Sequence, residues 1–486
     1  MPSQATHDVA WAAVHETHIG AVFLVGDRAY KLKKPVDFGF LNFTDRATRE
    51  QVCHREVELN RRLAPDVYLG VADVTGPDHH VCDHLVVMRR MPENRRLTSL
   101  VREAAPLTGT IRDLARILVT FHAKAERSPD IAAQGSRDAI LARWDDSFKQ
   151  VRPFHEAVLP HEVACEIERL THEFLAGREP LFHRRQTTGR IVDGHGDLLA
   201  DDIFCLDDGP RVLDCLEFDD RLRWVDGLDD VAFLAMDLER LGATELGELL
   251  LGYYAEFSGD PAPPALRHHY IAYRAFVRAK VACLRYAQDD DTAAELARTY
   301  ADIALRHLRQ GRPRMILVGG LPASGKSTLA DTIADRLGAT VLCSDRIRKE
   351  LAGIAPETPA AAGYREGLYD STHTRRTYTE LLRRASELLG LGETVVLDAS
   401  WTDAAHRQAA IDTAGQAYAP AIPLRCWAPA TVTSERLASR TASISDATPE
   451  IAHHMTADTH RWPEAHTILT AGQPEDSLTQ ALGYLE

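Results

Sequence analysis

The sequence contains no hydrophobic run long enough to cross a membrane and no recognisable export signal. No stretch of its 486 residues approaches the roughly 18 consecutive apolar residues of a membrane span. The first residues, Met1 to Val9, have neither the basic nor the apolar region of a signal peptide. These absences predict a protein that has no membrane partner and works in the cytoplasm.

Positive charge is also in short supply. The chain carries 56 lysine and arginine residues against 71 aspartate and glutamate residues, which leaves a net charge of -15. A chain this acidic repels nucleic acid and anionic membranes unless a local basic patch compensates. The balance therefore disfavours a nucleic acid partner and suits a neutral or cationic substrate for at least one site.

Cysteine and histidine patterns indicate neither disulfides nor zinc. The eight cysteines include no CxxC pair, so most are expected to be small buried apolar side chains. Histidines occur as adjacent pairs, whereas two ligands of one metal are usually roughly four residues apart. We predict surface or loop positions for His79-His80, His268-His269 and His453-His454.

The length predicts more than one domain. We place the boundary at the linker Gln310–Pro313, because its glycine and proline break the preceding helix. This gives an N-terminal domain of residues 1–309 and a C-terminal domain of residues 310–486. The first is expected to have a strand-rich small lobe over about 10–91 and a helical large lobe over about 92–309.

A GxxxxGKS motif opens the C-terminal half. It follows the apolar strand Met315–Val318 and precedes the helix Thr328–Leu337, a context in which this loop wraps nucleotide phosphates with backbone N–H groups. Lys326 is expected to bridge the β- and γ-phosphates of ATP, and the Ser327 hydroxyl to bind Mg²⁺. The expected nucleotide contacts are Gly320, Leu321, Pro322, Ala323, Ser324, Gly325, Lys326, Ser327 and Thr328.

Two carboxylates follow strands of the same half. Asp345 comes soon after the strand Thr340–Cys343, and Asp398 closes the strand Thr394–Leu397. Ligands of open α/β sheets collect at the carboxyl ends of strands, so Asp398 is expected to orient Mg²⁺ or its water. Asp345 has two interpretations, a group of the acceptor site or the N-cap of the helix Arg346–Leu351.

The segment Ser344–Arg348 resembles the acceptor site of small P-loop kinases related to gluconate kinase, polynucleotide 5′-kinases and zeta-type toxins. The resemblance implies that Asp345 accepts the proton of the attacking hydroxyl. It also implies that Arg348, three residues later, contacts the acceptor.

Further arginines of this half are candidates for the same site. Arg436 and Arg440 are one helical turn apart and match the lid arginines of these kinases, which neutralise charge on the transferring phosphoryl group. A solvated basic helix face is the alternative. Arg407, with its neighbours Trp401 and His406, is expected to touch the acceptor.

The N-terminal half contains a second motif of phosphoryl transfer. The run Gly194–Asp197, with a strand that ends at Asp214 downstream, resembles the catalytic and metal-binding loops of the aminoglycoside phosphotransferase family, which has a protein-kinase-like fold. The resemblance implies that Asp197 is the catalytic base and that Asp202 and Asp214 bind Mg²⁺. The family pattern HGDxxxxN has asparagine where this chain has Asp202. A carboxylate still binds a hard cation, but it adds negative charge.

The same resemblance places a nucleotide-binding lysine on the predicted strand Ala29–Lys33. Lys31 stands in the Ala-x-Lys position, and Lys33 lies on the same strand face as a second choice. Glu56 lies within the apolar stripe of a helix predicted over residues 45–63, where an unpaired charge is costly, so we predict an ion pair with Lys31. A glutamate that reaches solvent from the edge of the stripe is the alternative.

Other positions of the N-terminal half follow from the resemblance. Val86–Met91 fits the hinge that holds adenine, through the backbone of Met88 and Arg90. The glycine-poor loop His15–Gly20 stands where the nucleotide-covering loop is expected, and Asp230 matches the aspartate that braces the catalytic loop. Three cations of a late helix either meet an anionic acceptor or form a solvated face: Arg274, Arg278 and Lys280.

The predicted fold is an α+β protein-kinase-like domain of the aminoglycoside phosphotransferase type joined to an α/β P-loop NTPase domain, in an order that resembles bacterial fusions of the two. We expect a bifunctional phosphotransferase that uses ATP and Mg²⁺ to phosphorylate hydroxyls of small polar molecules, such as sugars or aminoglycoside-like compounds. Two alternatives remain. The N-terminal half is a regulatory pseudokinase, as Asp202 suggests, or the P-loop half is a polynucleotide or other hydroxyl kinase.

Overall fold

The computed structural model describes residues 12–16, 20–37, 42–288, 290–355, 358, 366–438 and 449–485. The chain forms two compact units that alternate along the sequence. The first unit contains Met1–Val163, Arg185–Ala262 and Tyr270–Leu305. The second contains Ala164–Arg184, Pro263–His269 and Arg306–Glu486.

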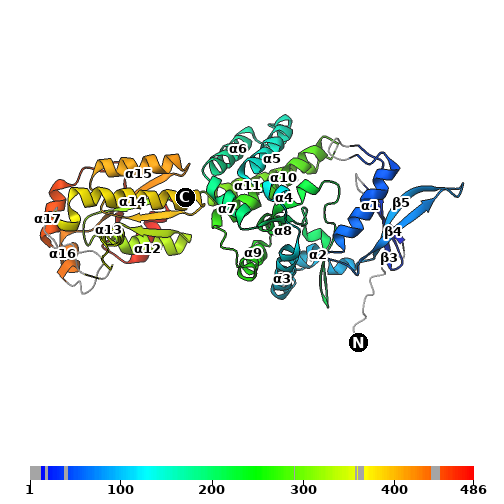
Figure 1. The fold of residues 1–486 in the computed structure, drawn as a ribbon, viewed down its shortest axis with the longest axis horizontal. Coiled ribbons are helices and arrows are strands. Elements are labelled where there is room, and N and C mark those ends of the chain that lie inside the picture. Colours follow the sequence, from blue (N-terminus) through cyan, green and yellow to red (C-terminus); the bar gives the residue numbers. More distant parts are fainter. Residues whose placement is uncertain are drawn as a thin grey trace. The chain divides into compact units, whose positions relative to one another are not determined.

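The first unit begins with a five-stranded antiparallel sheet in the order β1-β2-β3-β5-β4 (Figure 1). Strands β2 and β3 form a hairpin whose turn contains Gly26, with a φ of 58° that glycine adopts without strain. The bounds are β1 Ala12–Glu16, β2 Gly20–Val25, β3 Arg28–Lys33, β4 Tyr68–Thr75 and β5 Val81–Arg89.

Helix α1, Arg46–Asn60, packs against β4 and β5. It begins where the Asp45 side chain accepts a hydrogen bond from the backbone N–H of Thr48 at 2.9 Å. Glu56 is buried on this helix. The helix therefore brings a carboxylate into the interior of the unit.

The following part of the chain is mainly helical, as predicted, and is interrupted by two two-stranded antiparallel sheets. Their strands are β6 Ile191–Asp193 with β9 Trp224–Asp226, and β7 Ile203–Leu206 with β8 Gly209–Val212. The helices are α2 Leu97–Arg102, α3 Thr108–Lys124, α4 Pro129–Ala133, α5 Arg137–Val151, α6 His161–Ala176, α7 Glu179–Thr187, α8 Gly227–Arg240, α9 Thr244–Ser258, α10 Pro264–Tyr286 and α11 Ala293–Gln310. No helix in the described ranges has the length and apolar character that crossing a bilayer requires.

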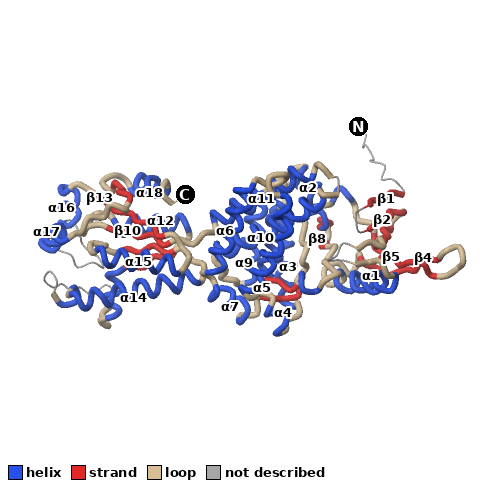
Figure 2. Tube along the Cα trace, turned by 90° about the horizontal axis from the view of Figure 1, so that it is seen from above, coloured by secondary structure: helices blue, strands red, loops and turns tan. Residues whose placement is uncertain are grey.

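The second unit contains a five-stranded parallel sheet in the order β11-β12-β10-β13-β14 (Figure 2). Its strands are β10 Met315–Gly319, β11 Thr340–Cys343, β12 Val395–Asp398, β13 Ala421–Trp427 and β14 His466–Leu469. The accompanying helices are α12 Lys326–Leu337, α13 Ser344–Leu351, α14 Ser371–Gly390, α15 Ala404–Gln416, α16 Ala430–Ala438, α17 Pro449–Asp458 and α18 Pro474–Leu482.

Both faces of this sheet are buried. Along β10, Met315 and Leu317 belong to one apolar cluster, whereas Ile316 and Val318 belong to another, because successive side chains of a strand point to opposite faces. Helices cover a parallel sheet in this way on both sides, so a ligand is expected at the strand ends. The topology of the two sheets confirms the predicted fold class.

Candidate active sites

The loop after β10 has the backbone geometry of a phosphate cradle. Gly320 and Gly325 have φ angles of 143° and 86°, and Ala323 between them has a φ of 60°. A side chain at Gly320 would meet the carbonyl oxygen of Cys426 at 2.8 Å, so this position requires glycine. The loop leads into α12, whose first N–H groups and positive dipole end favour an anion.

Lys326 and Ser327 begin this helix two residues earlier than predicted. Lys326 Nζ donates to the carbonyl oxygen of Leu321 at 3.0 Å, which folds the lysine back over the loop. Ser327 Oγ donates to Asp398 Oδ2 at 2.7 Å, and burial raises the pKa of Asp398. Hydroxyl and carboxylate oxygens are ligands that Mg²⁺ prefers. The pair therefore fits a magnesium site that phosphate and water oxygens would complete.

Asp345 is a residue of the first turn of α13, and it does not cap that helix. The N-cap is Cys343, and no side chain makes a capping hydrogen bond there, so the N-cap interpretation is wrong. Arg348 Nε lies 3.8 Å from Asp345 Oδ1. The Arg348 guanidinium also donates to the Leu368 carbonyl at 2.9 Å and to Thr374 Oγ1 at 3.2 Å. These contacts fix the arginine beside the carboxylate.

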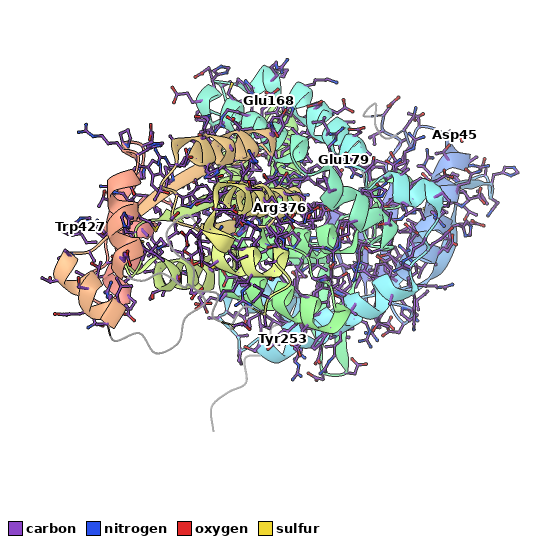
Figure 3. The ribbon with its side chains drawn as sticks, turned by 60° about the vertical axis from the view of Figure 1, so that its left-hand side comes forward. Asp45, Glu168, Glu179, Tyr253, Arg376 and Trp427 are labelled. Atoms are coloured by element: carbon purple, nitrogen blue, oxygen red, sulfur yellow. The ribbon has the colours of Figure 1, made fainter. Side chains whose placement is uncertain are left out.

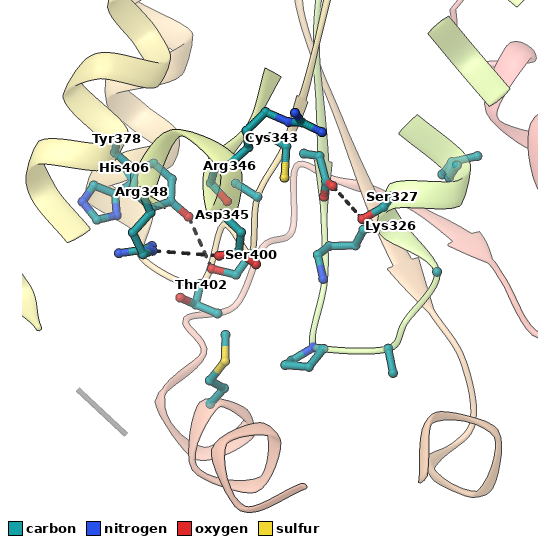
Figure 4. Close-up of a pocket in the computed structure, with 18 of the residues that line it drawn as sticks. Lys326, Ser327, Cys343, Asp345, Arg346, Arg348, Tyr378, Ser400, Thr402 and His406 are labelled. Atoms are coloured by element: carbon teal, nitrogen blue, oxygen red, sulfur yellow. Dashed lines mark hydrogen bonds and ion pairs between the residues drawn. The ribbon is translucent and has the colours of Figure 1, made fainter. Parts of the chain in front are cut away.

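One cavity of about 1450 Å³ collects these groups (Figure 4). The predicted residues that line it are Pro322, Ala323, Gly325, Lys326, Ser327, Thr328, Asp345, Arg348, Asp398 and Arg436. Lining residues that carry no motif, and that sequence reasoning missed, are Tyr369, Thr374, Arg375, Tyr378, Ser400, Thr402, Thr470, Gly472 and Pro474. Gly320, Leu321 and Ser324 are not among the described lining residues.

Of the two predicted lid arginines, Arg436 lies in the described part of the chain and contacts the loop after β10. Arg436 Nη2 donates to the carbonyl oxygen of Thr470 at 2.7 Å, and its Nη1 donates to that of Ala323 at 3.4 Å. Thr470 Oγ1 in turn donates to the Ser324 carbonyl at 2.6 Å. Arg436 is thus in contact with the phosphate loop rather than part of a solvated face. Arg440 lies outside the described residues.

Arg407 is not among the described residues that line the cavity. Its side chain is buried and donates to the carbonyl oxygens of Trp401 at 2.8 Å and Arg461 at 2.8 Å. The predicted contact with an acceptor is therefore wrong, because the guanidinium is used to hold two backbone segments together. Its neighbour His406 does line the cavity, and its ring stacks on Tyr378 with a centroid distance of 4.0 Å.

The N-terminal half brings the predicted lysines and glutamate together. Lys31 Nζ lies 2.9 Å from Glu56 Oε1, which confirms the predicted ion pair. Lys33 Nζ lies 2.6 Å from Glu56 Oε2, so both lysines are partners. Glu56 is fully buried, which rules out the solvent-reaching alternative. Burial acts to raise the pKa of Glu56, but the two positive charges outweigh it and lower the pKa below its usual value.

Both lysines also contact the loop after β8. Lys31 forms an ion pair with Asp214, and Lys33 forms one with Glu217. Glu217 was not predicted, because no motif marks a position three residues after the metal-binding aspartate. The lysine pair therefore connects β3, α1 and this loop.

Replacing Lys33 with methionine is expected to lower the free energy of unfolding by roughly 3–5 kcal/mol, because it leaves the largely buried Glu217 without its lysine and removes one of the two cations from Glu56. Lys34→Met, at a partly exposed neighbour paired with Glu16, should cost under about 1 kcal/mol. Urea denaturation of both variants checks the difference. Equal losses would show that the Lys33 contacts with Glu56 and Glu217 contribute no special stability.

Asp197 lies on a loop that Asp230 braces, as predicted. Asp230 accepts hydrogen bonds from the backbone N–H groups of His195 at 2.6 Å and Gly196 at 2.9 Å. His195 Nε2 donates to the Leu213 carbonyl at 3.0 Å, and Nδ1 accepts from the Asp197 N–H at 3.4 Å. Burial lowers the pKa of His195, so the neutral imidazole supplies the one donor and one acceptor that these contacts need.

Asp197, Asp202 and Asp214 repel one another. Burial, followed by the charges of Asp214 and Asp197, raises the pKa of Asp202 well above its usual value. Within the described residues, no group of three or more histidine, cysteine, aspartate or glutamate side chains is close enough to hold a metal alone. Repelling carboxylates suit a cation whose remaining ligands are phosphate and water oxygens. Asp202 and Asp214 therefore fit Mg²⁺ bound together with a nucleotide.

The predicted hinge, Val86–Met91, spans the end of β5 and the residues that follow it. Met88 is buried in an apolar cluster that spans β3, β5 and the loop after β8. The backbone N–H of Arg90, however, donates to the carbonyl oxygen of Asp27 at 2.8 Å, so the structure does not leave this group open for adenine. In the loop His15–Gly20, residues 17–19 lie outside the described part of the chain.

Polar residues of α10 are less exposed than predicted. Arg274 is buried, and it donates to Asp229 Oδ1 at 2.7 Å and to the Gly196 carbonyl at 3.2 Å. The solvated-face alternative is wrong for Arg274, which supports the catalytic loop because a buried cation needs internal partners. The other two of the three predicted cations are half-buried: Arg278 and Lys280.

The surface prediction for histidines is wrong for one pair. His269 is buried and stacks on Phe174 with a centroid distance of 4.4 Å, and His268 Nδ1 lies 2.8 Å from His307 Nδ1. Adjacent residues of a helix point in different directions, so one member of a pair can enter a core. The exposed pairs are His79-His80 and His453-His454.

Comparison with solved structures finds kinases at low identity. A choline/ethanolamine kinase family protein from Mesorhizobium loti is 16% identical, covers 62% of this chain and 94% of its own, and gives a TM-score of 0.39. A sugar kinase from Janibacter sp. HTCC2649 is 18% identical, covers 36% of this chain and 94% of its own, and gives a TM-score of 0.28. These scores are low, so the fold assignment rests on the topology given above and on the sequence relationships.

The sequence relationships are more extensive. The AAA domain family matches residues 315–461, the part of the chain that carries the GxxxxGKS loop. "Uncharacterized protein Rv2004c" of Mycobacterium tuberculosis and "Uncharacterized protein Mb2027c" of Mycobacterium bovis are each 43% identical over 474 residues, which is 98% of this chain and 95% of each relative. The chain therefore belongs to the same family as these mycobacterial proteins.

Proposed function

We propose that this chain is a bifunctional ATP-dependent phosphotransferase, in which each half phosphorylates a hydroxyl group of a small polar molecule. The observation that carries the proposal is that Asp345 and Arg348 share a cavity with Lys326, Ser327 and Asp398. A carboxylate beside a phosphate cradle suits transfer to a bound hydroxyl. A motor or switch ATPase needs no such acceptor group.

The arrangement of the cavity gives each side chain a role. In Figure 4, Lys326 and Ser327 lie on one side, and Arg348, Tyr378 and His406 lie on the other. The loop N–H groups and Lys326 hold the phosphates, and Asp345 accepts the proton of the attacking hydroxyl. Mg²⁺, when bound at Ser327 and Asp398, supplies charge neutralisation on the phosphate oxygens.

The N-terminal half supports a second transfer site. Asp197, on its braced loop, is the proposed base, and Lys31 is the proposed phosphate ligand. Burial raises the pKa of Asp197, although the nearby Arg278 acts to lower it, and a carboxylate with a raised pKa is a better proton acceptor. One observation favours the pseudokinase alternative for this half: Asp202 brings a further negative charge to the place where phosphates would bind.

Incubation of the protein with ATP, Mg²⁺ and a metabolite extract tests the proposal. Mass spectrometry should detect at least one phosphorylated product that is absent when Lys326→Ala replaces the wild-type protein, if the P-loop half is responsible. Products that persist with Lys326→Ala are assigned to the N-terminal half. ATP consumption without any phosphorylated product would contradict the proposed function.

Arginines around the acceptor side favour an acceptor that carries a negative charge. Arg346, Arg348 and Arg375 all line the cavity. Replacing Arg375 with glutamine is expected to raise the KM for the acceptor by roughly tenfold with little change in kcat, because a charged hydrogen bond contributes about 1.5–3 kcal/mol.

The adjacent Arg376 provides a matched control. It lies on the same helix (Figure 3), is exposed, and is not among the described residues that line the cavity. Arg376→Gln removes the same charge from the protein and should leave KM within about twofold, since long-range effects are screened by salt. Steady-state kinetics with the identified acceptor measure the KM of both variants. Equal KM values for the two variants would argue for a neutral acceptor.

A further inference from the structure

A second, much smaller cavity lies in the unit that carries the P-loop. Its lining includes Phe174 and Arg178 from the α6–α7 region, His269 from α10, Arg312 from the linker, and Tyr418. Its volume is about 10 Å³, close to the space that a single water-sized sphere requires. The cavity is unrelated to the phosphate site described above, because no lining residue is shared.

Arg178 enters this cavity with most of its hydrogen-bonding capacity unused. Its side chain is fully buried, and Nη1 donates to the carbonyl oxygen of Ala417 at 2.6 Å. Nε and Nη2 have no hydrogen-bond partner among the described residues. The guanidinium lies over the ring of Phe174 at 5.6 Å, which provides a partial electrostatic partner.

The surrounding charges do not neutralise Arg178. Arg312 Nη2 donates to Glu173 Oε2 at 3.1 Å, and its Nε is also buried without a partner in the described chain. The Glu173 carboxylate also accepts a hydrogen bond from Arg169 Nη1, at 2.5 Å through Oε1. Burial and the charge of Arg312 lower the pKa of Arg178 to about 10, so this group remains protonated at neutral pH. Arg178 thus lacks the counter-charge that a buried cation needs, whereas Arg312 is partly exposed and is paired with Glu173.

We propose that this cavity binds a small inorganic anion of the size of chloride, held by Arg178 with Arg312 as the second cation. The missing counter-charge calls for an anion rather than a water molecule. The small volume favours a single-atom ion over phosphate or a carboxylate ligand. Glu173 is the one carboxylate among the described lining residues, and it already pairs with Arg312 and Arg169, so it is not available to neutralise Arg178.

Bromide can replace chloride in crystals of the full-length protein and identifies the ion by anomalous scattering. The expected result is an anomalous peak within hydrogen-bond distance of Arg178 Nε or Nη2. Ordinary density without an anomalous signal would identify a water molecule and overturn the proposal. This measurement uses the wild-type protein, so it does not depend on the folding of a variant.

Thermal unfolding provides a second measurement. Replacing gluconate with chloride at constant ionic strength should raise the midpoint by roughly 3 °C at a tenfold excess over the dissociation constant. Arg178→Met should abolish this increase. Arg169→Met, at a half-exposed arginine outside the cavity lining, should retain it. The same chloride response in Arg178→Met and wild type would contradict binding at this site.

Discussion

Replacing Asp345 with asparagine is expected to lower the kcat of the P-loop half by roughly a thousandfold, within the range attributed to a general base. The amide has nearly the shape of the carboxylate but cannot accept the proton of the attacking hydroxyl. Nucleotide affinity should remain near that of the wild type, since Lys326 and Ser327 are untouched. Single-turnover transfer from labelled ATP measures the chemical step, and titration with a fluorescent nucleotide measures binding.

Asp331 offers a matched control within the same cavity. It is exposed on α12 and lines the cavity, but it lies outside the proposed acceptor contacts. Asp331→Asn removes the same charge and should change kcat by less than about threefold, since only long-range electrostatics is altered. If Asp345→Asn and Asp331→Asn reduce kcat equally, Asp345 is not the base and the acceptor assignment of the P-loop half fails.

The corresponding substitution in the N-terminal half, Asp197→Asn, is expected to reduce a different reaction by roughly a thousandfold. Phosphorylation by the P-loop half should continue at the wild-type rate, because the two sites lie in separate compact units. Product analysis by mass spectrometry, carried out side by side with Asp345→Asn, assigns each product to one half.

Asp201 provides the control for this experiment. It is exposed and adjacent to the proposed metal ligand Asp202, and Asp201→Asn should leave both reactions close to wild type. If Asp197→Asn changes no phosphorylation of any acceptor, the bifunctional proposal loses its basis. The pseudokinase alternative, with a P-loop half that works alone, would then describe the chain.

The features that were predicted correctly depend on short stretches of sequence. The phosphate loop follows from one motif and its flanking elements. The Lys31 to Glu56 ion pair follows from helical spacing, because a charge in an apolar stripe must find a partner. The bracing role of Asp230 followed from the family resemblance and is confirmed by its two backbone hydrogen bonds.

The errors involve residues whose surroundings are set by distant segments. Arg407 was assigned to the acceptor because it follows the Asp398 strand, but carbonyl groups of Trp401 and Arg461 fix its position. Arg274 was expected either at an anionic acceptor or on a solvated face, but its side chain is buried and donates a hydrogen bond to Asp229. A single sequence gives the charge of an arginine and leaves open which segment folds against it. Glu217 was overlooked for the same reason.

The contacts of Thr470 show which part of the chain the phosphate loop needs. Its hydroxyl holds the Ser324 carbonyl, and it lies directly after β14 at the edge of the sheet. The AAA domain match ends at residue 461. A fragment trimmed to that match would lack both the edge strand and this hydroxyl, so we expect a fragment that keeps the loop in its present geometry to extend beyond residue 461.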